Sequence, residues 1–101
     1  MLVDYILRHK AWSLATFGEG RKTKSIANHI RKELAEIEAE PNDLEEWIDV
    51  IILALDGAWR TGATESEIVA ALERKQRINQ LRKWLIPVDE DEPIEHIRSR
   101  E

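Results

Sequence analysis

The chain has 101 residues, including 20 acidic residues and 15 lysines and arginines, and its net charge is −5. This balance argues against a general nucleic-acid-binding protein, which would carry a basic patch. The chain has no cysteine, which excludes disulfides and thiolate metal sites and fits a reducing compartment such as the cytoplasm.

Apolar residues recur at helical spacing along most of the chain, and no segment alternates as a strand would. We therefore expect an all-α fold in a single domain spanning residues 1–101. Ser25 should cap the second helix, and Asn42 or Asp43 the third. The short breaks between helices predict antiparallel neighbours. The four main helices should span Leu2–Ala15, Ser25–Glu40, Asp43–Thr61 and Thr64–Leu85, with a short final helix at Pro93–Arg98 after the break at Pro87.

The first predicted helix leads into the one long loop expected in the chain, which carries Arg21 and two further cations beside its two glycines. The glycines could permit close backbone approach, and the cations could contact phosphate. Trp12 and Phe17 lie beside this loop and could stack on a nucleobase, since base–aromatic stacking tolerates any base. Trp12 could equally belong to the core, so both interpretations stay open.

Glu33 stands out in the second predicted helix because it falls on the apolar face. Glu36 and His29 lie along the edge of that face. A buried carboxylate is costly unless it is paired or bound to a metal ion. An internal salt bridge to a lysine or arginine would explain Glu33 as well as a metal would. The isoleucines that define the apolar face are Ile26, Ile30 and Ile37.

The third predicted helix is apolar along most of its length but is interrupted by Asp49 and Asp56, seven residues apart. By the helical period, both aspartates face the same way. Acids in a helix that is apolar nearly all round invite a functional explanation. The apolar run is too short for a membrane span. The start of the chain, Met1–Asp4, lacks a charged region before an apolar core, so we expect no secretory segment either.

Two acidic pairs flank the break at Pro41: Glu33 with Glu36, and Glu46 with Asp49. Carboxylates three residues apart share one helix face. Two such pairs on adjoining helices can therefore gather four ligands for a hard cation such as Mg²⁺. Similar spacings recur elsewhere in this acid-rich chain, and a run of charges is usually a solvated helix face. The apolar surroundings of Glu33 and Asp49 favour the metal interpretation.

The inward face of the fourth predicted helix changes from aliphatic to cationic and amide side chains halfway along. Ile68 and Leu72 begin this face, and Lys75, Asn79 and Arg82 continue it. Lysine and arginine bind phosphate oxygens, arginine often bidentately, and asparagine can both donate and accept. These side chains could bind phosphate, or they could neutralise the acids of the preceding helices.

Taken together, these residues resemble the all-α nucleoside triphosphate pyrophosphatases, the MazG-like superfamily. The similarity is closest to its small phage and bacterial dATP/dGTP diphosphohydrolases. It covers nearly the whole chain, and long matched strings are far more specific than isolated acids. The resembling segments are His29–Ala39, Asp43–Val50, Ile52–Arg60, Lys75–Gln76 with Asn79 and Arg82, and Ile94–Arg98.

The resemblance implies an enzyme that hydrolyses a nucleoside triphosphate, dATP or dGTP, to its monophosphate and pyrophosphate. It also implies a MazG-like four-helix bundle that assembles as a dimer or tetramer, in the cytoplasm of a bacterium or a phage-infected host. Glu33 or Glu36 would act as the general base. By this resemblance, the ligands of Mg²⁺ or Mn²⁺ would be Glu33, Glu36, Glu46 and Asp49, and the phosphate ligands Lys75, Asn79 and Arg82. Candidate contacts to base or phosphate are Trp12, Phe17, Arg21 and His29.

Two other functions stay open from the sequence. A pyrophosphatase of the same fold could prefer dUTP or dCTP, since no residue fixes the base. A non-catalytic helical regulatory or interaction module could instead use the acids as structural groups. In either case no nucleic-acid or membrane partner is expected.

Overall fold

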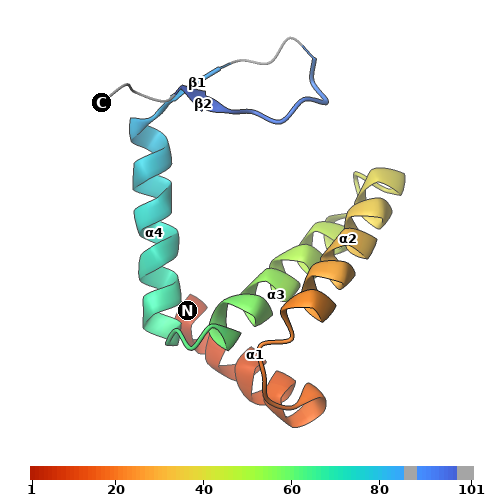
Figure 1. The fold of residues 1–101 in the computed structure, drawn as a ribbon, viewed down its shortest axis with the longest axis vertical. Coiled ribbons are helices and arrows are strands. Elements are labelled where there is room, and N and C mark those ends of the chain that lie inside the picture. The colour runs from red at the N-terminus through yellow and green to blue at the C-terminus, as the bar shows by residue number, and fades with distance from the viewer. Residues whose placement is uncertain (86–88, 98–101) are drawn as a thin grey trace. The chain divides into compact units, whose positions relative to one another are not determined.

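The computed structural model describes residues 1–85 and 89–97, and it divides into two compact units. The first unit, Met1–Val69, contains α1 (Leu2–Phe17), α2 (Thr23–Ala39), α3 (Leu44–Arg60) and the first turn of α4 (Glu65–Leu81). The second begins at Ala70 and contains the rest of α4 and the strands β1 (Lys83–Trp84) and β2 (His96–Ile97) (Figure 1). The predicted all-α class and its four main helices are confirmed. In the described parts, no helix is long and apolar enough to cross a membrane.

Helices α2 and α3 form an antiparallel hairpin and lie side by side, as Figure 1 shows. Asp43 caps α3, because its side chain accepts a hydrogen bond from the backbone N–H of Glu45 at 3.0 Å. The indole Nε1 of Trp47 donates to the backbone carbonyl of Pro41 at 3.0 Å and so fastens the turn. The predicted cap and the predicted antiparallel arrangement are therefore correct for this pair.

The segment between α1 and α2 has an unusual backbone. Helix α1 extends to Phe17 and ends at Gly18, whose φ of 84° is one that glycine adopts easily. Lys22 is the residue before α2, and it adopts the left-handed conformation with φ 51° and ψ 29°. The prediction that Ser25 caps α2 is wrong, because α2 begins at Thr23 and Ser25 lies inside its first turn.

Helix α1 packs against α3 and completes the small core of the first unit. Three apolar side chains in the described residues are buried, one each from α1, α2 and α3, and buried polar or charged side chains outnumber them. A polar interior of this kind needs internal partners or a ligand. The apolar group is Ile6, Ile37 and Trp59, and the polar group is His9, Ser13, Glu33, Asp56 and Arg60.

The predicted short helix at Pro93–Arg98 is wrong for the described part of that segment. His96 pairs with Trp84 in an antiparallel register, and the two rings lie edge to face with centroids 5.6 Å apart. An isolated six-residue helix is unstable in water, whereas pairing with β1 satisfies backbone groups of both strands. The same pairing explains why α4 ends at Leu81 rather than at the predicted Leu85. Pro87 and Arg98 lie outside the described residues.

Candidate functional site

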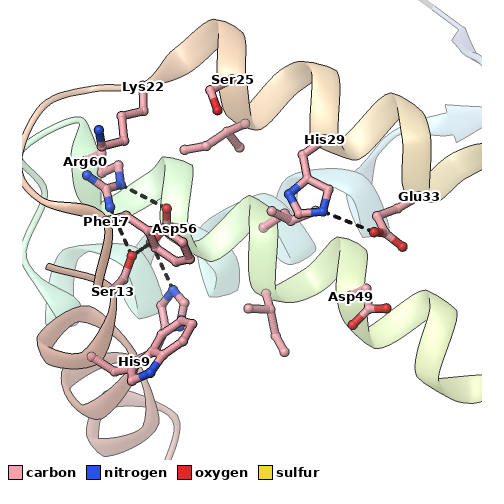
Figure 2. A pocket seen from close by; sticks show the side chains of 14 residues that line it. His9, Ser13, Phe17, Lys22, Ser25, His29, Glu33, Asp49, Asp56 and Arg60 are labelled. Atoms are coloured by element: carbon pink, nitrogen blue, oxygen red, sulfur yellow. Dashed lines mark hydrogen bonds and ion pairs between the residues drawn. The ribbon is translucent and has the colours of Figure 1, made fainter. Parts of the chain in front are cut away.

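A pocket of about 420 Å³ opens among α1, α2 and α3, within the usual range of small-molecule sites (Figure 2). Figure 2 shows Glu33 and Asp49 at one end and His9, Asp56 and Arg60 at the other. The side chains that line it are His9, Trp12, Ser13, Phe17, Lys22, Ser25, Ile26, His29, Glu33, Asp49, Ile52, Leu53, Asp56 and Arg60.

Glu33 and Asp49, two of the acids that the sequence singled out, line one end of the pocket. Glu33, on α2, and Glu46 and Asp49, on α3, each offer a carboxylate oxygen, and these atoms lie within 4.8 Å of one another. Glu33 is only 7% exposed. The antiparallel hairpin explains the convergence, because it places the second half of α2 beside the first half of α3.

Glu36 also belongs with these acids, because it raises the pKa of two of them. A hydrogen bond with the Glu36 carboxyl, followed by burial and by the charges of Glu36 and Asp49, raises the pKa of Glu33. Burial, followed by a hydrogen bond with Glu36, raises the pKa of Glu46. We call Glu33, Glu36, Glu46 and Asp49 the acid cluster. The structure thus brings three of the four proposed metal ligands within 4.8 Å of one another, and Glu36 is near enough to raise the pKa of two of them.

The acid cluster fits a divalent cation. Among the described residues, Glu33 Oε2 and Glu46 Oε2 are buried and have no hydrogen-bond partner. Oxygens in this state carry a desolvation cost that a bound cation would remove. The ion pair that Glu33 does make is with His29, whose Nε2 lies 3.2 Å from Glu33 Oε1. No lysine or arginine of residues 1–69 pairs with Glu33, so the salt bridge considered from the sequence is not formed there.

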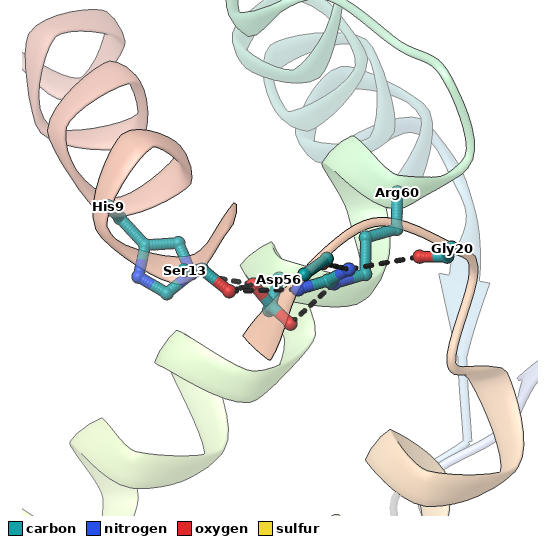
Figure 3. Close-up of polar contacts among 6 residues, drawn as sticks. His9, Ser13, Gly20, Asp56 and Arg60 are labelled. Carbon is teal, nitrogen blue, oxygen red and sulfur yellow. Dashed lines mark hydrogen bonds and ion pairs between the residues drawn. The ribbon is translucent and has the colours of Figure 1, made fainter. Parts of the chain in front are cut away.

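The opposite end of the pocket holds a compact polar network, drawn in Figure 3. Asp56 Oδ1 accepts from the Ser13 hydroxyl at 2.6 Å and lies 3.1 Å from His9 Nε2. Asp56 Oδ2 accepts from Arg60 Nε at 2.9 Å. Arg60 Nη2 also donates to the Ser13 hydroxyl at 3.0 Å. We call His9, Ser13, Asp56 and Arg60 the Asp56 network.

The Asp56 network stabilises the charged form of its carboxylate. Burial alone would raise the pKa of Asp56, but hydrogen bonds from Ser13 and Arg60, together with the Arg60 charge, outweigh burial. The net result is that the pKa of Asp56 is lowered. Both Asp56 oxygens are hydrogen-bonded within the protein. The other end of the pocket thus differs from the acid cluster in that its carboxylate is ionised and fully hydrogen-bonded.

Sequence reasoning found part of this network and missed the rest. It placed Asp56 on the same helix face as Asp49, and both residues do line the pocket. It gave no role to Arg60, although an acid and an arginine four residues apart on a helix are natural partners. His9 and Ser13 reach the network from α1, which no local pattern indicates.

Two exposed aromatic side chains form part of the pocket wall. Trp12 is 57% exposed and Phe17 is 56% exposed, and their rings meet edge to face with centroids 5.4 Å apart. His29 and Lys22 also line the pocket, whereas Arg21 lines a separate shallow depression beside Trp59. Of the four candidate contacts to base or phosphate, three therefore face the pocket.

The residues proposed to bind phosphate lie in the second unit. Lys75 and Asn79 are on the last turns of α4, and Arg82 follows the helix. Arg82 Nη1 donates to Asn79 Oδ1 at 3.5 Å, and the Asn79 carbonyl accepts from Trp84 Nε1 at 2.8 Å. Asn79 and Arg82 are thus neighbours on one side of the helix end. Their role as phosphate ligands stays a prediction.

A family model described as dATP/dGTP pyrophosphohydrolase matches residues 5–101. The match spans both compact units, the acid cluster and the Asp56 network. No curated protein and no solved structure matches the chain at a significant level.

Proposed function

The chain belongs to the dATP/dGTP pyrophosphohydrolase family and is a hydrolase of the triphosphate anhydride, and on this premise we propose that it converts dATP or dGTP to the monophosphate and pyrophosphate in a reaction that requires a divalent cation. The observation that carries this proposal is the acid cluster, in which Glu33 on α2 and Glu46 on α3 each have a buried carboxylate oxygen without a hydrogen-bond partner among the described residues. No other group in the described residues combines buried acids with unsatisfied oxygens beside a pocket.

The acid cluster would hold the cation through Glu33, Glu36, Glu46 and Asp49. Mg²⁺ and Mn²⁺ both favour oxygen ligands, and the cluster supplies carboxylates from two helices. When bound, such a cation would offset the negative charge of the phosphates and of the leaving pyrophosphate.

A carboxylate of the same cluster would accept the proton of the attacking water. A positioned carboxylate within hydrogen-bond reach of the attacking water is a usual general base in hydrolysis. The Glu36 carboxyl is close enough to raise the pKa of Glu33. Either Glu33 or Glu36 would therefore be the base. The oxygen of the water forms the new bond to phosphorus, the α–β anhydride bond breaks, and pyrophosphate leaves with the electron pair.

The nucleoside would occupy the opposite half of the pocket. Along α2, Ser25 and Glu33 are eight residues apart, which corresponds to about 12 Å at the helical rise of 1.5 Å per residue. A nucleotide with its phosphates at the acid cluster would therefore direct its base toward Trp12 and Phe17. Exposed aromatic rings of this kind stack on bases with little sequence preference, so the preference for purines rests on the family.

Lys75, Asn79 and Arg82 would complete phosphate binding, as the resemblance implies. The chain also exposes many large apolar side chains, which supports assembly into a homodimer or tetramer. In the first unit these include Leu2, Leu7, Leu34, Leu44, Trp47 and Ile51.

The proposal is tested by incubating the purified protein with dATP, dGTP, dCTP and dUTP, each with Mg²⁺, with Mn²⁺ or with EDTA. Pyrophosphate and monophosphate should appear in equal amounts, faster with the purine nucleotides, and only when a cation is present. Release of single phosphates, or equal turnover in EDTA, would contradict the proposal. Faster turnover of dUTP or dCTP would keep the enzyme class and change the substrate.

A further inference from the structure

Arg60 lines the pocket, but its guanidinium makes its hydrogen bonds within the protein. The side chain is 1% exposed. Its Nε donates to Asp56, its Nη2 donates to Ser13, and its Nη1 donates to the carbonyls of Gly18 and Gly20 at 2.8 and 2.9 Å. A guanidinium has five N–H groups, and four are used in these bonds. Arg60 is therefore poorly placed to act as a ligand of the substrate.

The two carbonyls that Arg60 holds belong to a backbone segment that needs an external constraint. Gly18, Gly20 and Lys22 have φ values of 84°, 110° and 51°. Glycine-rich segments have many accessible conformations, so fixing one of them costs conformational entropy. Asp56 in turn fixes the guanidinium. One buried arginine thus joins the end of α3 to two carbonyls of the segment from Gly18 to Lys22.

This segment determines where two pocket-lining side chains lie. Phe17 immediately precedes it and Lys22 ends it, and Figure 2 shows both at the Arg60 end of the pocket. Lys22 also immediately precedes α2. A change in the backbone of this segment would move an aromatic ring and a cation at the end of the pocket that lies opposite the acid cluster.

We propose that Arg60 is a positioning residue for substrate binding, which, anchored by Asp56, locks the segment Gly18–Lys22 and thereby places Phe17 and Lys22 against the nucleoside. The inference rests on the proposed function, because it assigns the nucleoside to this end of the pocket. Arg60 then governs the affinity for the nucleotide and leaves the chemical step at the acid cluster unchanged. A purely structural anchor would lower stability without altering the Michaelis constant.

The main test is Arg60→Lys, which keeps the charge but loses the planar fork of donors. We expect the KM for dATP to rise about ten-fold, while kcat stays within about two-fold of the native value, because misplaced binding groups weaken substrate binding and leave the reacting groups intact. An unchanged KM would overturn the inference, and so would a loss confined to kcat.

Two glycine variants supply a second route and a matched control. Gly20 and Gly62 both have positive φ, 110° and 101°, and an added Cβ would meet no atom within 4 Å at either site. Gly20→Ala strains the segment held by Arg60, whereas Gly62→Ala strains the turn after α3. Both should lower the melting temperature to a similar extent. Only Gly20→Ala should raise KM, and an equal rise in Gly62→Ala would overturn the inference.

Limited trypsin digestion separates this inference from the proposed function. Arg21, Lys22 and Lys24 are trypsin sites in or beside the segment, and cleavage there follows local opening. Cleavage should be about ten-fold faster in Arg60→Lys and in Gly20→Ala, and unchanged in Gly62→Ala. If these two variants are cleaved faster but the native protein hydrolyses no nucleotide, the proposed function is refuted and the locking role of Arg60 stands. Unchanged cleavage in both variants would refute the locking role of Arg60 whatever the activity.

Discussion

The Asp56 network lies at one end of the pocket and the acid cluster at the other, where Glu33 and Asp49 line it, and both groups bury charged side chains. They differ in how those charges are satisfied. In the acid cluster the pKa values of Glu33 and Glu46 are raised, and one oxygen of each has no partner among the described residues. In the Asp56 network the pKa of Asp56 is lowered, and both of its oxygens are bonded.

This difference separates two uses of buried polarity. A network whose hydrogen bonds are all made within the protein fixes backbone and side chains, and it contributes to stability. A cluster of like charges with unmet oxygens opposes folding until a ligand arrives, and such local conflicts are expected at functional sites. We therefore expect substitutions at the two ends to have opposite balances of activity and stability.

The largest expected effect is on activity at the acid cluster. Glu36→Gln or Asp49→Asn should lower pyrophosphate release by roughly 10²–10⁴-fold, because each removes a proposed cation ligand or general base. The far-ultraviolet circular dichroism should be unchanged, since like-charge repulsion is reduced. Glu38→Gln makes the same chemical change on an exposed position of α2 and should leave the rate unchanged. Full activity in Asp49→Asn would remove the metal-site interpretation.

The next effect is on stability at the other end. Asp56→Asn leaves the buried Arg60 charge without its acid, and it should lower the free energy of unfolding by about 3 kcal/mol, as for other buried pairs that lose one partner. Urea denaturation measures this change. Asp4→Asn also breaks an ion pair, but that pair is exposed, so little change is expected there. If the two variants lose similar amounts of unfolding free energy, burial of the Asp56 network adds nothing to stability.

Cation binding should act on the acid cluster alone. At a concentration of 100 times its dissociation constant, Mg²⁺ or Mn²⁺ should stabilise the folded protein by about 2.7 kcal/mol. For a chain of this size, the melting temperature would rise by roughly ten degrees. Asp49→Asn should abolish the rise and Asp56→Asn should retain it. An equal rise with NaCl of the same ionic strength would show simple charge screening instead.

The smallest effect is a dependence of stability on pH in EDTA, with opposite signs at the two ends. The raised pKa values of Glu33 and Glu46 mean that the folded state binds more protons than the unfolded state above their ordinary value of 4.5. Stability should therefore fall as pH rises from about 4.5 through the raised values. The lowered pKa of Asp56 works the other way: its contribution is present above 3.8 and is lost as pH falls through the folded-state value.

Urea denaturation between pH 3 and pH 8 would follow both limbs, with greatest stability in mildly acidic solution. Glu33→Gln should flatten the decline on the alkaline side and leave the acid side unchanged. A decline that persists in the double variant of Glu33 and Glu46 would assign it to other groups.

The sequence predicted the acid cluster well because its geometry is local. Glu33 and Asp49 interrupt apolar helix faces, and the short turn after Pro41 leaves few ways to arrange the two helices. The Asp56 network could be predicted only in part, since His9 and Ser13 reach it through tertiary packing. The pairing of β1 with β2 was missed because two-residue strands leave no periodic pattern.

The hairpin of α2 and α3 has a consequence for the order of folding. The acid cluster lies within the segment from Glu33 to Asp49, so its closure involves a short loop and little entropy. The Asp56 network joins side chains 43 and 47 residues apart in sequence. Contacts between residues near in sequence form early and distant ones late. The growing chain should thus assemble the acid cluster before the pocket closes against α1.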